Sequence, residues 1–357
     1  MSVVPTLTRQ NEIILMAIRA GTYWASRYLS GMNNHDDARA RCCAECGKEE
    51  GGVSLSLKTC KSCNLVKYCN ANCQRNHWPK HKKLCKQRAA ELRDEALFKD
   101  PPAKEDCPIC FLPMPIELMC CISLPPATIY SVPIHYFASA NEAHIDLETD
   151  MYYPCCGKCI CKGCVYTFCN SEQNGKCPFC TADQDGKTGE ENVEDTMKRA
   201  EANDPVSMSI LARKYYNGVL GVVQQDRTKA IELFTRSSEL GYSDAHYNLA
   251  VYYYEGGDKK KAKFHNEAAA MAGHEVARNW LACFEFQSGN IERAIKHWTI
   301  AASAGHYSAM FNLQVEFMKG AVSRESIDSI LTSYNNSCAE MRSEARDATV
   351  RAHINHN

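Results

Sequence analysis

The cysteines of this chain are clustered, and most of them come in close pairs. Of its 22 cysteines, all but Cys283 and Cys338 lie between Cys42 and Cys180. Five pairs have the C-x2-C spacing, which lets both thiolates bind one tetrahedral zinc ion. They are Cys43/Cys46, Cys60/Cys63, Cys107/Cys110, Cys161/Cys164 and Cys177/Cys180. Cysteines this close rarely form a disulfide, because the side chains cannot reach its geometry without distortion. The spacing therefore predicts zinc-bound thiolates.

The alternative is a secreted scaffold that is held together by disulfides, which would need a leader peptide. The apolar run 13–18 is short, ends at Arg19 and has no small-residue cleavage site. We therefore expect free thiols in a reducing intracellular compartment, the cytoplasm or the nucleus. The segment 1–41 is expected to be amphipathic or disordered.

Bulk properties exclude several classes of function. A length of 357 residues predicts two or three domains, and a net charge of -1 gives no global attraction to nucleic acid or to a membrane surface. No apolar stretch approaches the roughly 20 residues of a membrane helix. We therefore expect neither nucleic acid nor a membrane as a partner.

Two further pairs complete a first group of ligands. Cys69-x3-Cys73 and His81-x3-Cys85 follow the first two C-x2-C pairs, which gives eight donors, enough for two closed tetrahedral sites. An x3 gap places both residues of a pair on one face of a helix, and residues 74–81 are the expected helix.

The run Tyr68-Cys69-x3-Cys73-Gln74-x3-Trp78-x2-His81-Lys82-x2-Cys85 resembles the MYND zinc finger, and every ligand position of that family is filled. The resemblance implies interleaved ligation. One zinc would take Cys43, Cys46, Cys69 and Cys73, and the other Cys60, Cys63, His81 and Cys85. MYND fingers bind proteins, often as proline-containing peptides, in a groove at the positions of Gln74 and Trp78. The other interpretation of Trp78 is that it packs the small core. His77 lies off the ligand positions and is expected at the surface.

A second cysteine group, from Cys107-Pro-Ile-Cys110 to Cys177-Pro-Phe-Cys180, resembles a RING finger. The resemblance again implies interleaved ligation. One zinc would take Cys107, Cys110, Cys161 and Cys164, and the other Cys177 and Cys180 with two residues of the Cys155–Cys159 group. Lys158 stands where common RINGs have a histidine, so the sequence is similar to all-cysteine variants. We predict Cys155 and Cys156 as the remaining ligands, with Cys159 as the alternative.

A RING finger recruits a ubiquitin-conjugating enzyme and has no nucleophile of its own, so no catalytic residue is predicted. Its contact positions correspond to Ile109 and Pro178, while Thr181 and Ala182 stand where a ubiquitin-clamping cation is typical. The segment 111–154 is interpreted as an inserted loop with β character around 127–137. A metal-binding role for four of its residues is the alternative; they are Cys120, Cys121, His135 and His144.

The C-terminal half repeats with a step of 32 residues. Small and apolar residues keep this step in four series: Ala245/Ala277/Ala309, Leu249/Leu281/Leu313, Gly241/Gly273/Gly305 and Ala230/Ala262/Ala294. Such a period predicts stacked helical hairpins, with Ala where helices cross closely and Gly where a helix ends in a left-handed cap.

The pattern of Leu211, Tyr216, Gly218, Gly221-Val222 and Asp226 resembles the SEL-type subclass of tetratricopeptide-like repeats. Three units are complete, and a fourth fades after residue 320. The family binds proteins on its concave face. Aromatic residues could line this face or could simply form the core; they are Tyr215, Tyr216, Tyr252, Tyr253, Tyr254 and Trp298.

The sequence therefore predicts a multidomain chain, with two small zinc-stabilised modules followed by an all-α helical-repeat solenoid. The expected order is an N-terminal segment (1–41), a MYND-type finger (42–86), a helical linker (87–104), a RING-like finger with a long insertion (105–182), an acidic linker (183–196), SEL-type repeats (197–340) and a C-terminal tail (341–357). Four closed sites would hold four structural zinc ions and leave no open coordination position for a catalytic water. The predicted function is a protein-interaction adaptor; the alternative is a RING-type ubiquitin ligase whose other modules select the substrate.

Overall fold

The computed structural model describes residues 42–49, 56–115, 150–171, 175–219 and 221–356. The chain divides into two compact units, Met1–Ala96 and Leu97–Asn357. The predicted N-terminal segment 1–41 lies outside the described residues. So does most of the insertion, with its expected β character and its Cys120, Cys121, His135 and His144.

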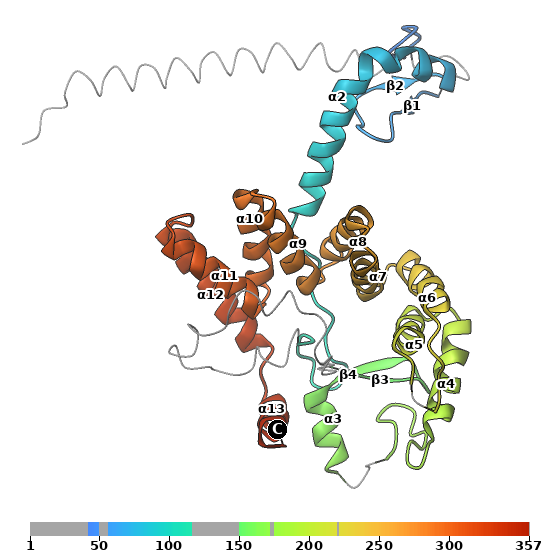
Figure 1. The fold of residues 1–357 in the computed structure, drawn as a ribbon, viewed down its shortest axis with the longest axis vertical. Helices are drawn as coiled ribbons and strands as arrows, with labels where there is room; N and C mark the ends of the chain where they lie inside the picture. Colours follow the sequence, from blue (N-terminus) through green and yellow to red (C-terminus); the bar gives the residue numbers. More distant parts are fainter. Residues whose placement is uncertain (1–41, 50–55, 116–149, 172–174, 220, 357) are drawn as a thin grey trace, which may run out of the picture. The chain divides into compact units, whose positions relative to one another are not determined.

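The first unit contains a short hairpin and a long helix (Figure 1). Strand β1 (Lys58–Thr59) pairs antiparallel with β2 (Lys67–Tyr68). Helix α2 (Ala71–Leu97) then runs for 27 residues and continues into the predicted linker 87–104. Residues 86–97 contain neither Gly nor Pro and are rich in Ala, Leu, Glu and Arg, which favour helix.

The core of the first unit is built almost entirely from cysteines. Leu57 and Tyr68 are buried among the thiols of the two ligand groups. So small a core cannot offset the loss of chain entropy by burial alone, so this unit needs metal to fold.

The second unit begins with another hairpin. Strand β3 (Asp150–Tyr153) pairs antiparallel with β4 (Lys158–Cys161), with Met151 opposite Ile160, and helix α3 (Lys162–Cys169) follows at once. Tyr153 and Ile160 are buried among the cysteines of this module.

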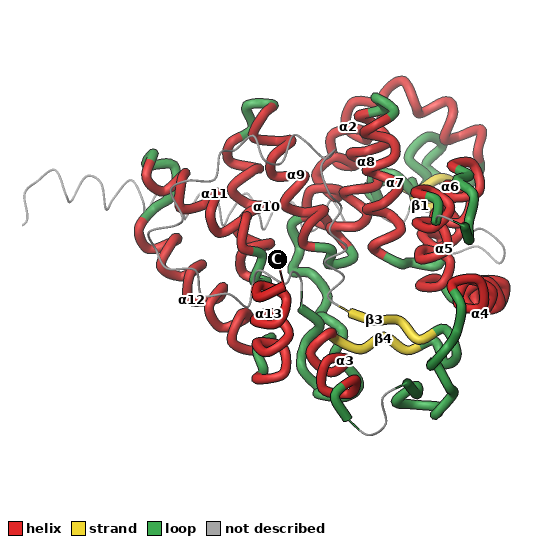
Figure 2. Tube along the Cα trace, turned by 60° about the horizontal axis from the view of Figure 1, so that its bottom comes forward, coloured by secondary structure: helices red, strands yellow, loops and turns green. Residues whose placement is uncertain are grey.

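Helical hairpins form the rest of the second unit (Figure 2). They comprise α4 (Gly189–Glu201), α5 (Pro205–Asn217), α6 (Arg227–Glu239), α7 (Ser243–Glu255), α8 (Lys259–Met271), α9 (Glu275–Gln287), α10 (Ile291–Ser303), α11 (Tyr307–Met318) and α12 (Arg324–Glu340). Within hairpins α5 packs on α6, α7 on α8 and α9 on α10, and each hairpin also packs on the next. The predicted helical-repeat solenoid is confirmed.

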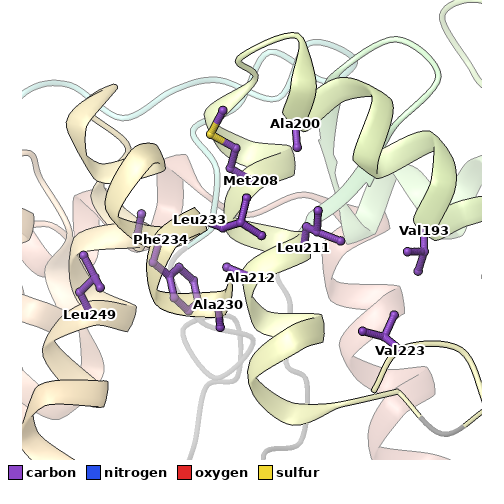
Figure 3. Packing of buried hydrophobic residues seen from close by; sticks show 11 residues of the cluster. Val193, Ala200, Met208, Leu211, Ala212, Val223, Ala230, Leu233, Phe234 and Leu249 are labelled. Carbon is purple, nitrogen blue, oxygen red and sulfur yellow. The ribbon is translucent and has the colours of Figure 1, made fainter. Parts of the chain in front are cut away.

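The residues that set the 32-residue step have the expected roles. The six repeated alanines are fully buried where helices pack, and Gly241, Gly273 and Gly305 have positive φ angles of 89°, 97° and 96° just after a helix. A left-handed residue ends a helix at little cost only when it lacks a Cβ. Figure 3 shows the core of the first hairpin, with Met208 and Leu211 of α5 beside Leu233 of α6.

Two helices occupy segments for which the sequence predicted none. Helix α4 begins within the expected acidic linker, because the Glu191 N–H donates to the Thr188 hydroxyl (3.1 Å) while the Thr188 N–H donates to the Glu191 carboxylate (2.8 Å). This reciprocal cap stabilises a helix start. Helix α13 (Glu344–His356) occupies the expected C-terminal tail and packs against α3.

Candidate metal centres

Sixteen cysteine and histidine side chains gather in four groups of four, and within each group all ligand atoms lie within 4.8 Å of one another. Centre 1 is Cys43, Cys46, Cys69 and Cys73; centre 2 is Cys60, Cys63, His81 and Cys85; centre 3 is Cys107, Cys110, Cys161 and Cys164; centre 4 is Cys155, Cys156, Cys177 and Cys180. The structure thus brings together every residue predicted as a ligand, in the predicted interleaved groups.

The elements of the first unit explain how centres 1 and 2 assemble. The pair Cys60/Cys63 lies in the turn between β1 and β2, and Cys69 follows β2 directly. Helix α2 carries Cys73 in its first turn and places His81 and Cys85 one helical turn apart on the same face. Tight turns and a helix face thus hold the donors without help from a large core.

The distances between sulfur atoms fit zinc. Adjacent Sγ atoms are 3.6 Å apart in Cys46/Cys69, 3.7 Å in Cys60/Cys85, 3.8 Å in Cys107/Cys164, 3.6 Å in Cys156/Cys177 and 3.5 Å in Cys155/Cys180. A tetrahedron with Zn–S bonds of about 2.3 Å has edges of about 3.8 Å. A disulfide bond would be about 2.0 Å. The described cysteines are all free thiols, so each group is a tetrahedral donor set, and the four sets fit four zinc ions.

Four of the C-x2-C pairs share one backbone turn. The residue after the second cysteine has a positive φ angle and donates its N–H to the carbonyl of the first cysteine at 2.8–3.0 Å. These residues are Gly47, Asn64, Phe111 and Thr181. Only one of them is glycine, so the residue types do not signal this conformation, which is strained for Phe and Thr. Binding of metal by both thiolates of a pair would hold such a strained turn in place.

The first cysteine of each of these turns has a lowered pKa. Burial opposes the charged form, but backbone N–H groups that point at the sulfur outweigh it. They lower the pKa of Cys43 to about 6 and those of Cys107 and Cys177 to about 7. The pKa of Cys85, in contrast, is raised to about 12 by burial and by its neighbouring thiols. A thiol such as Cys43 can therefore bind metal as a thiolate near neutral pH, whereas a thiol such as Cys85 must release its proton when metal binds.

The structure separates the alternatives for centre 4. The Sγ atoms of Cys155 and Cys156, at the turn between β3 and β4, join those of Cys177 and Cys180. Cys159 instead lies on β4 opposite Tyr152 and is not part of the group. The two adjacent cysteines can face one centre because the turn continues to Gly157, whose φ is 71°.

His77 has a neighbour that its sequence position did not suggest. It is half-buried, the Tyr68 hydroxyl lies 2.9 Å from its Nδ1 atom, and its ring stacks on that of His81 (centroids 5.6 Å apart, 12° between planes). His77 is therefore outside the ligand sets, as expected, but its ring is half-buried. Its contacts fix the orientation of a predicted ligand, as groups behind metal ligands commonly do.

The predicted partner-binding positions of the first unit are open to solvent. Trp78 is 40% exposed, and Gln74 lies exposed one helical turn before it on α2. Trp78 also touches the His81 ring edge-on, with centroids 6.4 Å apart. It therefore borders the ligand ring and presents an apolar face to solvent at the same time.

In the second module, Ile109 between the first two ligands is 39% exposed, whereas Pro178 between the last two is half-buried. Thr181, exposed after the last ligand, donates its hydroxyl to the Cys180 carbonyl (2.7 Å).

The aromatic residues of the repeats divide between core and surface. Trp298 is 3% exposed and packs in the core, so it does not line a binding face. Tyr254 is 47% exposed and meets Trp280 edge-on, with ring centroids 5.5 Å apart.

Two arginines from helices outside the cysteine modules reach the centres. Arg199 of α4 donates to the carbonyls of Pro154 (3.0 Å) and Cys155 (3.3 Å), beside centre 4. Arg346 of α13 donates to ligand sulfurs of centre 3. The sequence did not predict either residue, because both act over long separations and no local pattern marks them.

No helix in the described part of the chain has the length and apolar character needed to cross a membrane.

Comparison with known proteins identifies two kinds of module. The family model of the MYND finger matches residues 43–85, and that of the Sel1 repeat matches residues 205–242, 243–274 and 284–306. Both are protein-interaction modules, so proteins are the expected partners.

Similar solved structures include a protective antigen of uropathogenic Escherichia coli with an SLR fold (22% identity, TM-score 0.35, covering 47% of this chain and 40% of that chain). A Sel1 repeat protein from Oxalobacter formigenes has 22% identity and a TM-score of 0.38, covering 50% and 71%. An immunity protein from Pseudomonas aeruginosa has 20% identity and a TM-score of 0.27, covering 42% and 75%. The chain thus spans less than half the length of the first of them. From the family matches, we conclude that this chain combines a MYND finger with Sel1 repeats.

Proposed function

We propose that this chain is a non-catalytic adaptor whose zinc-bound modules and repeats each bind protein, within the domain limits predicted from the sequence. The sixteen residues of centres 1 to 4 are the proposed ligands of four zinc ions. The main support for this proposal is that each group offers four protein ligands around one point, which is a complete tetrahedral coordination shell. A zinc ion with four protein ligands has no position left for a reacting water, so its role is structural.

The MYND finger is the proposed site for a proline-containing peptide, at Gln74 and Trp78. An exposed tryptophan face buries a proline ring well, and its indole N–H can bind a peptide carbonyl. Calorimetric titration with a proline-rich peptide library tests this site. Trp78→Ala should weaken binding at least tenfold with zinc content unchanged. Leu84→Ala is the matched control, because Leu84 is an exposed apolar residue of the same helix (53%). Equal affinity of both variants would exclude the site at Trp78.

A second proposed binding surface is the concave face of the repeats, with Tyr254 as an exposed aromatic contact. Cross-linking of the full chain to a captured protein partner, followed by Tyr254→Ala, tests it. If the affinity for the partner does not change on this substitution, Tyr254 is not part of the binding surface.

One observation favours a second function, that of a RING-type ubiquitin ligase. Centres 3 and 4 take alternating pairs of cysteines along the chain, and Ile109 stands exposed between two ligands of centre 3. Catalysis would then consist of holding a charged conjugating enzyme in a reactive geometry. Against this function, Thr181 stands directly after the last ligand, where a cation that clamps ubiquitin is typical.

A ubiquitin-chain assay with a broad panel of conjugating enzymes decides between the two functions. A ligase should form chains and lose this activity on Ile109→Ala. Met151→Ala is the control, because Met151 is equally exposed on β3 (42%). No chain formation with any enzyme would leave the adaptor alone.

A further inference from the structure

Arg346 of helix α13 is buried at centre 3, with only 3% of its surface exposed. Its Nε–H donates to the Sγ atom of Cys161 (3.3 Å), and its Nη2 atom donates to the Sγ atom of Cys110 (3.4 Å) and the Leu112 carbonyl (3.4 Å). The Nη1 atom donates to the carbonyls of Pro113 (2.8 Å) and Met341 (2.6 Å). A guanidinium has five N–H donors, and all five have acceptors here.

None of these five acceptors is a carboxylate. A buried guanidinium without a counter-charge is costly, so its charge must be balanced by another group. Four thiolates around Zn²⁺ carry a net charge of about -2, which supplies that balance at centre 3.

The backbone of α13 also lies very close to this centre. Gly163 is placed between the ligands Cys161 and Cys164 on α3, and a Cβ atom there would lie 2.6 Å from Cγ and 2.8 Å from the backbone N of Arg346. Such distances are far below van der Waals contact. Glycine at this position therefore lets the two helices approach, although its φ does not require glycine.

We propose that Arg346 is a positioning residue of centre 3, so that zinc occupancy of this centre and docking of α13 form one coupled equilibrium. This inference rests on the proposed zinc at centre 3. By capping two thiolates, Arg346 strengthens zinc binding, and the zinc centre in turn holds Arg346 in place. Loss of zinc from centre 3 then releases α13.

The first test compares zinc affinities of the full chain by competition with a chromogenic chelator. Arg346→Met keeps an unbranched chain of similar length but removes all five donors. One of the four zinc ions should then bind 10- to 100-fold more weakly, as is usual when a group behind a metal ligand is lost. The other three serve as internal references. Arg342→Met is the matched control, because Arg342 precedes the same helix and pairs with Asp347 at the surface.

Gly163→Ala provides an independent variant that leaves the guanidinium intact. Alanine normally favours a helix over glycine, yet here it should displace α13 and weaken the same zinc ion. Hydrogen exchange of residues 344–356 is the second readout. Removal of one zinc equivalent from centre 3 should raise exchange in this helix while the repeats stay protected.

Unchanged affinity for all four zinc ions in Arg346→Met would overturn the inference, because the arginine would then only dock the helix. Persistent protection of 344–356 after zinc removal from centre 3 would overturn it too. Wild-type protein that binds fewer than four zinc ions would instead count against the proposed zinc sites themselves, and the inference would fail with them.

Discussion

The Tyr152 hydroxyl of strand β3 donates to the Asp204 carboxylate at 2.6 Å, and Asp204 is also the residue that caps helix α5. One oxygen of the carboxylate binds the tyrosine, while the other accepts the N–H groups of Val206 and Ser207. Burial and the neighbouring Asp204 raise the pKa of Tyr152, so the hydroxyl stays protonated as a donor. The hairpin of the second cysteine module is thereby fastened to the first repeat.

Removal of this hydroxyl should weaken the second unit. We expect Tyr152→Phe to lower the free energy of unfolding by about 1.5 kcal/mol, since the bond has a charged acceptor and is half-buried. Urea unfolding followed by circular dichroism measures the change. Tyr166→Phe is the control, because Tyr166 is exposed (38%) and should change stability little. Similar losses in both variants would contradict this role of the bond.

Zinc content should follow the donor sets. Elemental analysis of the full chain is expected to give four zinc ions, and Cys60→Ser should give fewer because a neutral hydroxyl replaces a thiolate in centre 2. Cys338→Ser lies outside all four sets and should still give four. A wild-type content of two or fewer zinc ions per chain would show that one of the two cysteine modules does not bind zinc as proposed.

Acid should destabilise the repeats through two histidines. Burial lowers the pKa of His297 to about 3, and burial together with His246 lowers that of His265 to about 4. In the unfolded chain both titrate near 6.5. Below pH 6.5 the unfolded state therefore binds more protons, so the free energy of unfolding falls as pH drops, down to about pH 4 for His265 and pH 3 for His297.

Urea unfolding at pH 7 and pH 5, with zinc in excess, measures this slope. His297→Asn should show a smaller loss between the two pH values than the wild-type protein. Parallel losses in the two proteins would show that His297 does not carry the effect.

The buried alanines of the helical repeats should not tolerate larger side chains. Ala282 of α9 is fully buried in the core of the later hairpins. Leucine there adds three carbons to a closely packed space, which should cost about 1–3 kcal/mol. Ala339→Leu on the exposed side of α12 is the matched control, because both residues favour helix. Equal melting temperatures for the two variants would contradict close packing at Ala282.

The parts of the fold that sequence could predict depend on short separations. A two- or three-residue gap fixes which thiols can share a turn, so the pairs Cys60/Cys63 and His81/Cys85 were visible directly. The hairpins were predictable from the 32-residue repeat, because each alanine in a series occupies the equivalent packing position in the next repeat. The sequence allowed Trp298 to lie either in the core or on the binding face, and its burial in the structure places it in the core.

The contacts that sequence missed join distant segments. Arg346 and Cys161 are 185 positions apart, and nothing around either residue signals the other. The left-handed conformations of Phe111 and Thr181 were not predicted for a different reason. Both residue types disfavour a positive φ angle, and metal binding by the neighbouring cysteines would offset that strain. The start of α4 was readable in principle from Thr188 and Glu191, but the acidic composition of that segment suggested a linker.

The long separation between Cys161 and Arg346 has a consequence for the order in which the protein matures. As the chain leaves the ribosome, Cys107, Cys110, Cys161 and Cys164 are all available well before the repeats have been made. Centre 3 can therefore load its metal early, but it receives its arginine only after helix α13 has been synthesised. Between those two moments the nascent protein carries a metal site with an uncompensated negative charge, and the completion of helix α13 marks the point at which that charge is neutralised.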